Sequence, residues 1–252
     1  MLSLDAVTCG YGPAAVVHGL DLKVEAGEVV ALIGPNGAGK TSTIQCIAGH
    51  VRAQSGRVRL GEEDMTAMSP QQRVARGVAV SPEGRRLFGD MTVRENLIVG
   101  GLSRPRAATK ANLERVLALF PRLQERLESL GGTLSGGEQQ MTAIGRAMMA
   151  EPKLLMIDEV SLGLTPKNVD ICYQAIAQLK QSGVALLLVE QNLPRALKAA
   201  DRVYVLESGR LQWSGSAAEA RSRRDLLERI LGQSGDVSGA VEATAHSPAS
   251  AS

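Results

Sequence analysis

The stretch that decides the fold is Gly34-Pro35-Asn36-Gly37-Ala38-Gly39-Lys40-Thr41, which fits the phosphate-loop pattern G-x-x-x-x-G-K-[ST] without a mismatch. Glycines let successive backbone N–H groups turn inward around phosphate oxygens, because no Cβ atom blocks them. The apolar run over 29–33 before it predicts a buried parallel strand, and residues 41–48 after it predict a helix. This order of strand, glycine loop and helix predicts an α/β fold with a phosphate site.

Lys40 and Thr41 give this loop its expected chemistry. The Lys40 ammonium can reach the terminal phosphates of a nucleotide, the Thr41 hydroxyl can bind Mg²⁺, and the helix start adds its positive dipole end. The alternative is a glycine turn with Lys40 exposed, but the flanking strand and helix favour the phosphate site. We predict nucleotide contacts from a run of nine residues: Gly34, Pro35, Asn36, Gly37, Ala38, Gly39, Lys40, Thr41 and Ser42.

A second apolar run ends in two acids, Leu154-Leu155-Met156-Ile157-Asp158-Glu159. Four apolar residues predict a buried strand, and ligands gather at the carboxyl ends of strands in α/β sheets. We expect Asp158 to bind Mg²⁺ through water, and Glu159 to activate an attacking water as a general base. A strand that ends in solvated acids is the alternative, which the complete phosphate loop in the same chain disfavours.

The segment Leu134-Ser135-Gly136-Gly137-Glu138-Gln139-Gln140 predicts a second anion site. Ser135 and two glycines precede a predicted helix over 138–150, so free N–H groups can face a phosphate there. One nucleotide at the phosphate loop does not need two such helix starts. The alternative is a helix that uses Ser135 only as its cap.

The remaining segments predict more α/β structure around a helical insertion. Strands are expected near 20–24, 58–60, 184–189 and 203–206, and helices over 169–180, 194–200 and 226–231. Residues 90–150 are mostly helical: Thr92 and Glu95 have capping-box spacing, and Leu113, Val116, Leu117 and Phe120 form one helix face. Helical spacing continues through Leu123, Leu127 and Leu130 up to Gly131. From Gln233 on, Ser, Ala and Gly dominate, which predicts a disordered tail over 233–252.

Composition excludes several classes of protein. The net charge is only +2 and aromatic residues make up 2%, so neither a basic surface nor stacking platforms for nucleic acid are expected. The apolar runs are too short to cross a bilayer, and no export signal is visible at the start. Cys9, Cys46 and Cys172 are scattered and odd in number, which indicates reduced thiols in a cytoplasm.

The phosphate loop, the LSGGEQQ segment and the LLMIDE strand together resemble the ABC transporter ATPase family, in order and in approximate spacing. The resemblance spans residues 2 to 232. It implies a phosphate-loop NTPase of ABC type: a mainly parallel core sheet, an N-terminal antiparallel β subdomain, and a helical subdomain inserted over about 88–150 within an ATPase domain over 1–232. ATP and Mg²⁺ are the implied cofactors, and ATP hydrolysis is the implied activity.

The resemblance also implies how the two anion sites are used. Two ATPase subunits would dimerise head-to-tail, with each ATP held between one phosphate loop and the partner's Ser135, Gly136 and Gly137. Tyr11 matches the aromatic residue that stacks on adenine in this family.

Four positions depart from the common family pattern. Glu83 replaces a glutamine that contacts Mg²⁺ and the attacking water, and a carboxylate can still bind Mg²⁺. Gln191 replaces a histidine that touches the γ-phosphate; glutamine can donate a hydrogen bond and orient water, but it cannot titrate. Val160 replaces a proline, and Thr165 replaces an aspartate that contacts the partner subunit.

Four strings, PEGRRLF (82–88), MTVRENL (91–97), SLGL (161–164) and VEQN (189–192), look like one subgroup: the second ATPase subunit of bacterial branched-chain amino-acid importers. The partners implied are membrane permease subunits, a second ATPase subunit and, indirectly, a solute-binding protein. The implied location is the cytoplasmic face of the inner membrane, reached through the permeases. Related importers carry urea, amides or aromatic acids, so the resemblance is less specific for the cargo.

Two other classes of phosphate-loop protein fit the sequence less well. A soluble ABC ATPase that acts on ribosomes or DNA usually has two modules or a long coiled coil, whereas about ninety residues separate the phosphate loop from Ser135 here. A phosphate-loop kinase or GTPase would leave Ser135 to Gln140 without a role, and no Asn-Lys-x-Asp guanine reader is present.

Overall fold

The structure, a computed structural model, describes residues 1–232, so the tail predicted over 233–252 lies outside the described residues. A six-stranded sheet has the order β10-β9-β3-β8-β7-β6. Its central strands are β3 (Val29–Ile33), β8 (Ala185–Glu190) and β7 (Leu154–Asp158), flanked by β6 (Val78–Ser81) and β9 (Arg202–Glu207), and all neighbours among these five are parallel. The edge strand β10 (Arg210–Ser216) runs antiparallel to β9. The expected mainly parallel sheet is confirmed.

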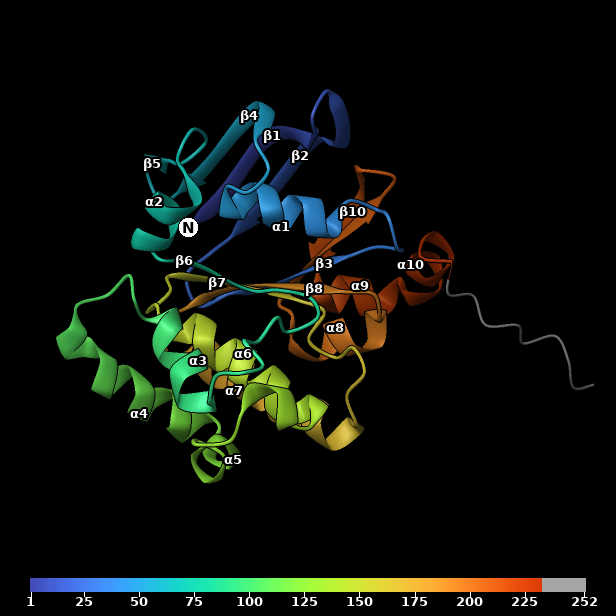
Figure 1. Cartoon of the computed structure of the whole chain (residues 1–252). Helices are drawn as coiled ribbons and strands as arrows, with labels where there is room; N and C mark the ends of the chain where they lie inside the picture. The colour runs from blue at the N-terminus through green and yellow to red at the C-terminus, as the bar shows by residue number, and fades with distance from the viewer. Residues whose placement is uncertain (233–252) are drawn as a thin grey trace, which may run out of the picture.

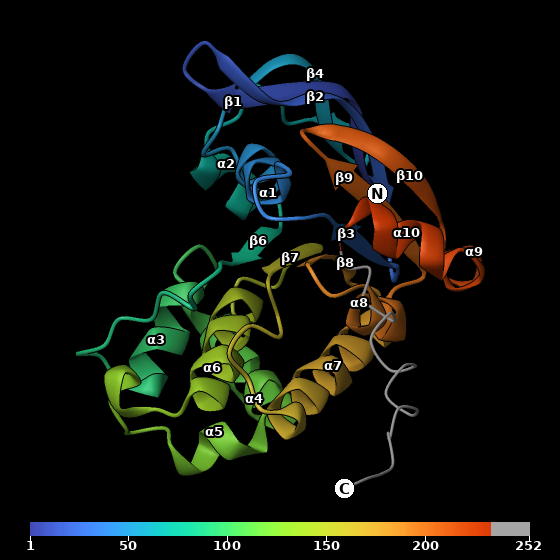
Figure 2. The ribbon, with the colours of Figure 1, turned by 90° about the vertical axis from the view of Figure 1, so that its right-hand side faces the viewer.

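A second, antiparallel sheet has the order β2-β1-β4-β5. Its strands are β1 (Leu2–Tyr11), β2 (Ala14–Val24), β4 (Ala53–Leu60) and β5 (Glu63–Asp64). Helix α1 (Lys40–Ala48) lies between this sheet and the parallel one (Figures 1 and 2). The N-terminal antiparallel sheet predicted above is therefore confirmed.

Alternating side chains of the buried strands enter different cores. On β8, Ala185, Leu187 and Val189 face the core that holds α1 and the antiparallel sheet, whereas Leu186 and Leu188 face the helices on the other side. This follows from the two-residue period of a strand. Because both faces are covered, the central strands are apolar throughout, as the continuous runs predicted.

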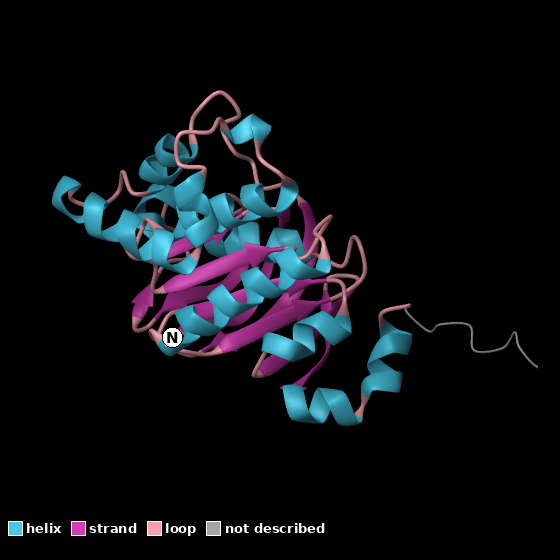
Figure 3. Cartoon of the chain, turned by 90° about the horizontal axis from the view of Figure 1, so that it is seen from below, coloured by secondary structure: helices cyan, strands magenta, loops and turns pink. Residues whose placement is uncertain are grey.

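Helices cover the face of the parallel sheet opposite α1 (Figure 3). Between β6 and β7 the chain forms α3 (Val93–Gly100), α4 (Thr109–Leu119), α5 (Pro121–Glu125) and α6 (Gly136–Met148), with 3-10 turns at Arg106–Ala108 and Gly131–Thr133. Helices α7 (Pro166–Gln181) and α8 (Leu193–Ala199) link the later strands, and α9 (Ala217–Ser222) and α10 (Arg224–Ile230) follow β10. In residues 1–232, no helix combines the length and apolar character that a membrane span requires.

The helical pattern predicted through Leu127 and Leu130 is wrong, because α5 ends at Glu125. The backbone after it turns to meet the start of α3 instead. The N–H of Val93 donates to the Ser129 carbonyl at 3.0 Å, and the N–H of Arg94 donates to the Leu127 carbonyl at 2.9 Å. The first N–H groups of a helix have no partner within it, so these carbonyls satisfy them, and helix over 127–130 would remove that pairing.

Helix α1 is tied down at its carboxyl end by a buried arginine. Arg73, in the short helix α2 (Pro70–Ala75), is only 2% exposed. Its guanidinium donates to the carbonyls of Cys46 at 2.7 Å and Ile47 at 2.8 Å, near the end of α1. A cation suits this end, since the helix dipole is negative there.

Candidate active site

The phosphate loop lies between β3 and α1, where the predicted strand and helix are both found. A Cβ atom at Gly34 would lie 2.3 Å from the Leu206 carbonyl oxygen, so only glycine fits this close approach to β9. Gly39, the residue before α1, has φ 102°, which other residues rarely adopt. The glycines of the motif are thus required by the loop geometry itself.

Lys40 folds back over the loop. Its Nζ donates to the carbonyls of Gly34 at 2.8 Å and Pro35 at 3.0 Å, and the residue is 6% exposed. Burial lowers the pKa of Lys40, while the nearby carboxylates of Glu159 and Asp158 oppose that shift. The ammonium is therefore held at the loop among acids, in reach of an anion that replaces the carbonyls.

One cavity of about 520 Å³ brings the distant parts of the predicted site together. It is lined from the phosphate loop, from Glu83 after β6, from Glu159 after β7 and from Gln191 after β8. These three strand ends lie at the carboxyl edge of the parallel sheet, where ligands are expected. The lining residues are Val16, Asn36, Gly37, Gly39, Lys40, Thr41, Ser42, Glu83, Glu159, Leu162 and Gln191.

Asp158, which directly precedes the cavity residue Glu159, is not itself among the residues that line this cavity. It is 3% exposed, and its Oδ1 has no hydrogen-bond partner among residues 1–232. The pKa of Asp158 is raised to about 6, mainly by burial; the Thr41 hydroxyl opposes the rise, and the Glu83 and Glu159 carboxylates contribute to it. A buried carboxylate oxygen without a partner, beside a hydroxyl and two more carboxylates, is a donor set that suits a divalent cation.

Glu159 has an unusual backbone. Its φ is 55°, in the left-handed region that non-glycine residues seldom enter. Its N–H donates to the Val189 carbonyl at 3.0 Å, and its carboxylate accepts a hydrogen bond from the Gln191 side-chain amide. The structure therefore brings the two predicted catalytic side chains into direct contact.

The loop that carries Glu83 is connected to two other segments. Arg85, two residues later, donates to the Gln139 side-chain oxygen at 3.1 Å and to the Leu162 carbonyl at 3.2 Å. Gln139 belongs to α6, and Leu162 to the loop after Glu159. Arg85 was not predicted as a site residue, although it lies within the PEGRRLF string (82–88) two residues after Glu83.

Ser135, Gly136 and Gly137 begin α6 and lie outside the lining of the phosphate cavity of the same chain. Ser135 forms a full capping box: the N–H of Glu138 donates to its hydroxyl, and the Glu138 carboxylate accepts from the Ser135 N–H at 2.9 Å. Ser135 therefore caps the helix, as the alternative above requires. This role is compatible with the predicted anion site, because Gly136 and Gly137 still provide N–H groups at the helix start.

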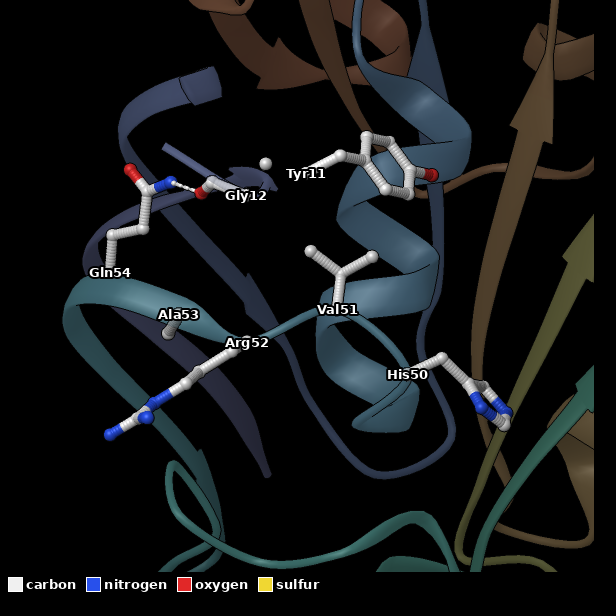
Figure 4. A pocket seen from close by; sticks show the side chains of 8 residues that line it. Tyr11, Gly12, His50, Val51, Arg52, Ala53 and Gln54 are labelled. Atoms are coloured by element: carbon white, nitrogen blue, oxygen red, sulfur yellow. Dashed lines mark hydrogen bonds between the residues drawn. The ribbon is translucent and has the colours of Figure 1, made fainter. Parts of the chain in front are cut away.

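Tyr11 also lies apart from the phosphate cavity. It ends β1, is 59% exposed, and lines a separate hollow of about 650 Å³ with residues 50–54 (Figure 4). Figure 4 shows Val51 beside the tyrosine ring and Gln54 bonded to the Gly12 carbonyl at 3.0 Å. Its predicted contact with adenine stays a prediction.

The parallel sheet, the glycine loop and the acids at the strand ends define a nucleotide-binding phosphate-loop ATPase. A family model described as "ABC transporter" matches residues 17–161, more than half of the chain. The chain belongs to the ABC transporter ATPase family.

Two curated relatives align over nearly their whole length. The chain is 44% identical to "High-affinity branched-chain amino acid transport ATP-binding protein BraG" of Pseudomonas aeruginosa, over 92% of this chain and 100% of that protein. It is 34% identical to "Probable branched-chain amino acid transport ATP-binding protein LivF" of Archaeoglobus fulgidus, over 92% of this chain and 99% of that one. Such relatives do not support the alternative of a non-transport ABC ATPase.

Solved structures agree with the fold. An ATP-binding subunit of an ABC transporter superimposes with a TM-score of 0.78 at 30% identity, over 93% of this chain and 95% of that one. A nucleotide-free ATP-binding cassette from an ABC transporter gives a TM-score of 0.82 at 25% identity, over 91% and 96%. The predicted ABC-type fold is confirmed.

Proposed function

We propose that this chain binds and hydrolyses Mg-ATP to power the import of branched-chain amino acids, or of related amino acids and amides, through permease subunits on other polypeptides. The observation that carries the proposal is the cavity that joins the phosphate loop, Glu83, Glu159 and Gln191 in a chain 44% identical to a branched-chain amino-acid transport subunit.

Phosphate binding falls to the loop and to Lys40. The nine residues from Gly34 to Ser42 supply backbone N–H groups and the start of α1, and Lys40 supplies a positive charge. When phosphate oxygens arrive, they replace the Gly34 and Pro35 carbonyls as partners of the Lys40 ammonium. Tyr11 is proposed to contact the adenine.

Mg²⁺ fits the residues at the base of the phosphate loop and the adjoining strand ends. Thr41, Asp158 and Glu83 would hold it, and the orphaned Oδ1 of Asp158 supports this assignment. When bound, the ion neutralises charge on the phosphates. The three ligand side chains come from α1, β7 and the loop after β6, so the site depends on the folded sheet edge.

Hydrolysis is assigned to Glu159 as general base, with Gln191 as the residue that orients it. The Glu159 carboxylate accepts the proton of the attacking water, and the Gln191 amide directs that carboxylate through their hydrogen bond. The Gln191 amide cannot titrate, so Glu159 is the proton acceptor of this pair.

Ser135, Gly136 and Gly137 are proposed to contact the nucleotide of a partner ATPase subunit. Their place outside the chain's own phosphate cavity supports that arrangement. The chain would lie on the cytoplasmic face of the inner membrane through its permeases, and a solute-binding protein would deliver the cargo. We also propose the division into an ATPase domain over 1–232, with its helical subdomain over about 88–150, and a tail over 233–252.

The test combines the purified chain with its neighbouring permease subunits, and with a second ATPase subunit where one is encoded beside it, in sealed vesicles that contain Mg-ATP. Uptake of labelled leucine, with its binding protein outside the vesicles, should require ATP and stop with Glu159→Gln. Uptake of urea or an aromatic acid in place of leucine would show that the proposed cargo is wrong. ATP hydrolysis without any uptake would contradict the import function.

A further inference from the structure

Glu190, the last residue of β8, is a buried carboxylate that the proposed chemistry does not use. It is 2% exposed and pairs in register with Ile33, the residue before the phosphate loop. Its two oxygens accept hydrogen bonds from the Ser161 hydroxyl and the Tyr173 hydroxyl, each at 3.1 Å. Neither donor carries a charge. A carboxylate buried against neutral hydroxyls costs free energy that an apolar side chain would avoid, so stability alone explains it poorly.

The Ser161 bond acts on the segment that carries Glu159. Ser161 lies two residues beyond Glu159, in the loop between β7 and α7. The left-handed backbone of Glu159 is unfavourable for a non-glycine residue, and such a conformation persists only where the surroundings hold it. Two hydrogen bonds hold it here: the Glu159 N–H to the Val189 carbonyl, and the Ser161 hydroxyl to Glu190. Both acceptors belong to the last two residues of β8.

We propose that Glu190 is a positioning residue for ATP hydrolysis: through Ser161 it fixes the strained backbone that aims the Glu159 carboxylate into the phosphate cavity. The inference rests on the proposed role of Glu159. The next residue, Gln191, bonds to the Glu159 side chain, so the end of β8 holds both the backbone and the carboxylate of that residue.

Tyr173 provides an internal comparison. It lies in α7 and donates to the other Glu190 oxygen, Oε1, whereas Ser161 donates to Oε2. Removing the tyrosine hydroxyl therefore disturbs the same buried carboxylate but leaves the loop around Glu159 attached. If Glu190 acts through Ser161, the two hydroxyl deletions should differ in their effect on turnover.

The experiment compares Ser161→Ala, Tyr173→Phe, Glu190→Gln and Glu190→Leu in the full chain, with its partner subunits where turnover requires them. Ser161→Ala should lower kcat about tenfold, because it removes one hydrogen bond to a charged group. Tyr173→Phe should stay within about twofold of wild type. Glu190→Gln keeps an acceptor oxygen for Ser161 and should retain more activity than Glu190→Leu. ATP affinity should be unchanged in all four, since none of them alters the phosphate loop.

A double variant separates positioning from general stability. Ser161→Ala combined with Glu190→Leu should lower kcat no further than Glu190→Leu alone, because both act through one bond. Wild-type kcat in Ser161→Ala, an equal fall in Tyr173→Phe, or additive effects would each overturn the inference. Should Glu190→Leu fail to fold, the two hydroxyl deletions still decide.

Amide hydrogen exchange gives a readout that does not need turnover. Exchange in residues 159–163 should be faster in Ser161→Ala than in Tyr173→Phe, with or without nucleotide. Equal exchange in the two variants would refute the role of Glu190. If exchange is faster in Ser161→Ala than in Tyr173→Phe but the wild-type chain hydrolyses no ATP, the structural link stands and the proposed function is refuted.

Discussion

The side-chain amide of Gln191 donates a hydrogen bond to the carboxylate of Glu159, from the end of β8 to the end of β7. The two residues are 32 positions apart in sequence and meet only because β7 and β8 are parallel neighbours. The family resemblance implies a histidine where Gln191 stands. This bond is consistent with the proposed role of Gln191, which requires a hydrogen-bond donor and no proton transfer.

Gln191→Ala should lose most ATP hydrolysis, on the order of 10²-fold, because the Glu159 carboxylate loses its orienting donor. Gln191→His should retain substantial activity, since imidazole also donates a hydrogen bond. Steady-state turnover at saturating Mg-ATP measures both. Gln181→Ala, at an exposed glutamine on α7, is the matched control. Wild-type turnover in Gln191→Ala would remove this residue from the site.

Glu159→Gln should bind ATP normally and stop hydrolysis, because glutamine keeps the shape of the side chain but cannot accept the proton. An ATP-bound dimer should accumulate on gel filtration, with the same chain or with a second ATPase subunit. Glu114→Gln, on the exposed face of α4, should behave as wild type. Full hydrolysis by Glu159→Gln would place the base elsewhere.

Lys40→Ala should abolish ATP binding or nearly so. The ammonium is the main side-chain charge at the loop, and it is already held there by the Gly34 and Pro35 carbonyls. Nucleotide titration measures the affinity, and Lys110→Ala, at an exposed lysine of α4, provides the comparison. An unchanged affinity would refute the phosphate-loop assignment.

Ser135→Arg should block hydrolysis and leave ATP affinity of the isolated chain near normal, because Ser135 lies outside its own cavity. Ser135→Ala controls for the helix cap, whose loss costs about 1 kcal/mol of stability. Thermal unfolding and ATP titration should be run on both variants. If monomeric Ser135→Arg no longer binds ATP, the serine belongs to its own subunit's site.

Glu190→Gln should be stabilised relative to wild type as pH rises. Burial raises the pKa of Glu190 above its ordinary 4.5; the Glu159 charge adds to this, while the Tyr173 and Ser161 hydroxyls and Arg195 oppose it. A raised carboxyl pKa contributes stability below pH 4.5 that is lost as pH rises through the folded-state pKa. Denaturant unfolding between pH 4 and 8 should show the variant gaining on wild type. A pH-independent difference would mean that Glu190 does not titrate on folding.

Much of this fold could be predicted from the sequence, because its strongest signals are local. The run over 29–33 and the glycine loop after it predicted β3 and α1 within one residue. Strands β6 and β10 and helices α2 and α9 have no counterpart among the predicted elements. Their side chains are fixed mainly by contacts with neighbours in space, which spacing along the chain does not report.

The candidate site shows the same division. Glu159 and Gln191 could be placed at strand ends by pattern, whereas Glu83 was named only from the family resemblance. The structure brings all three to one cavity. The hydrogen bond between Glu159 and Gln191, the left-handed backbone of Glu159 and the burial of Glu190 depend on strand order and register. No motif in a single chain records which strands are neighbours, so these features required the structure.

Arg73 has a consequence for how the phosphate loop can respond to its ligand. Helix α1 begins directly after the phosphate loop, and the buried Arg73 guanidinium holds its other end. A movement of α1 along its axis would break the buried hydrogen bonds between Arg73 and the last turn of the helix. Nucleotide binding is therefore not expected to shift α1 along its axis. We expect binding to rearrange the side chains and loops that border the phosphate cavity instead.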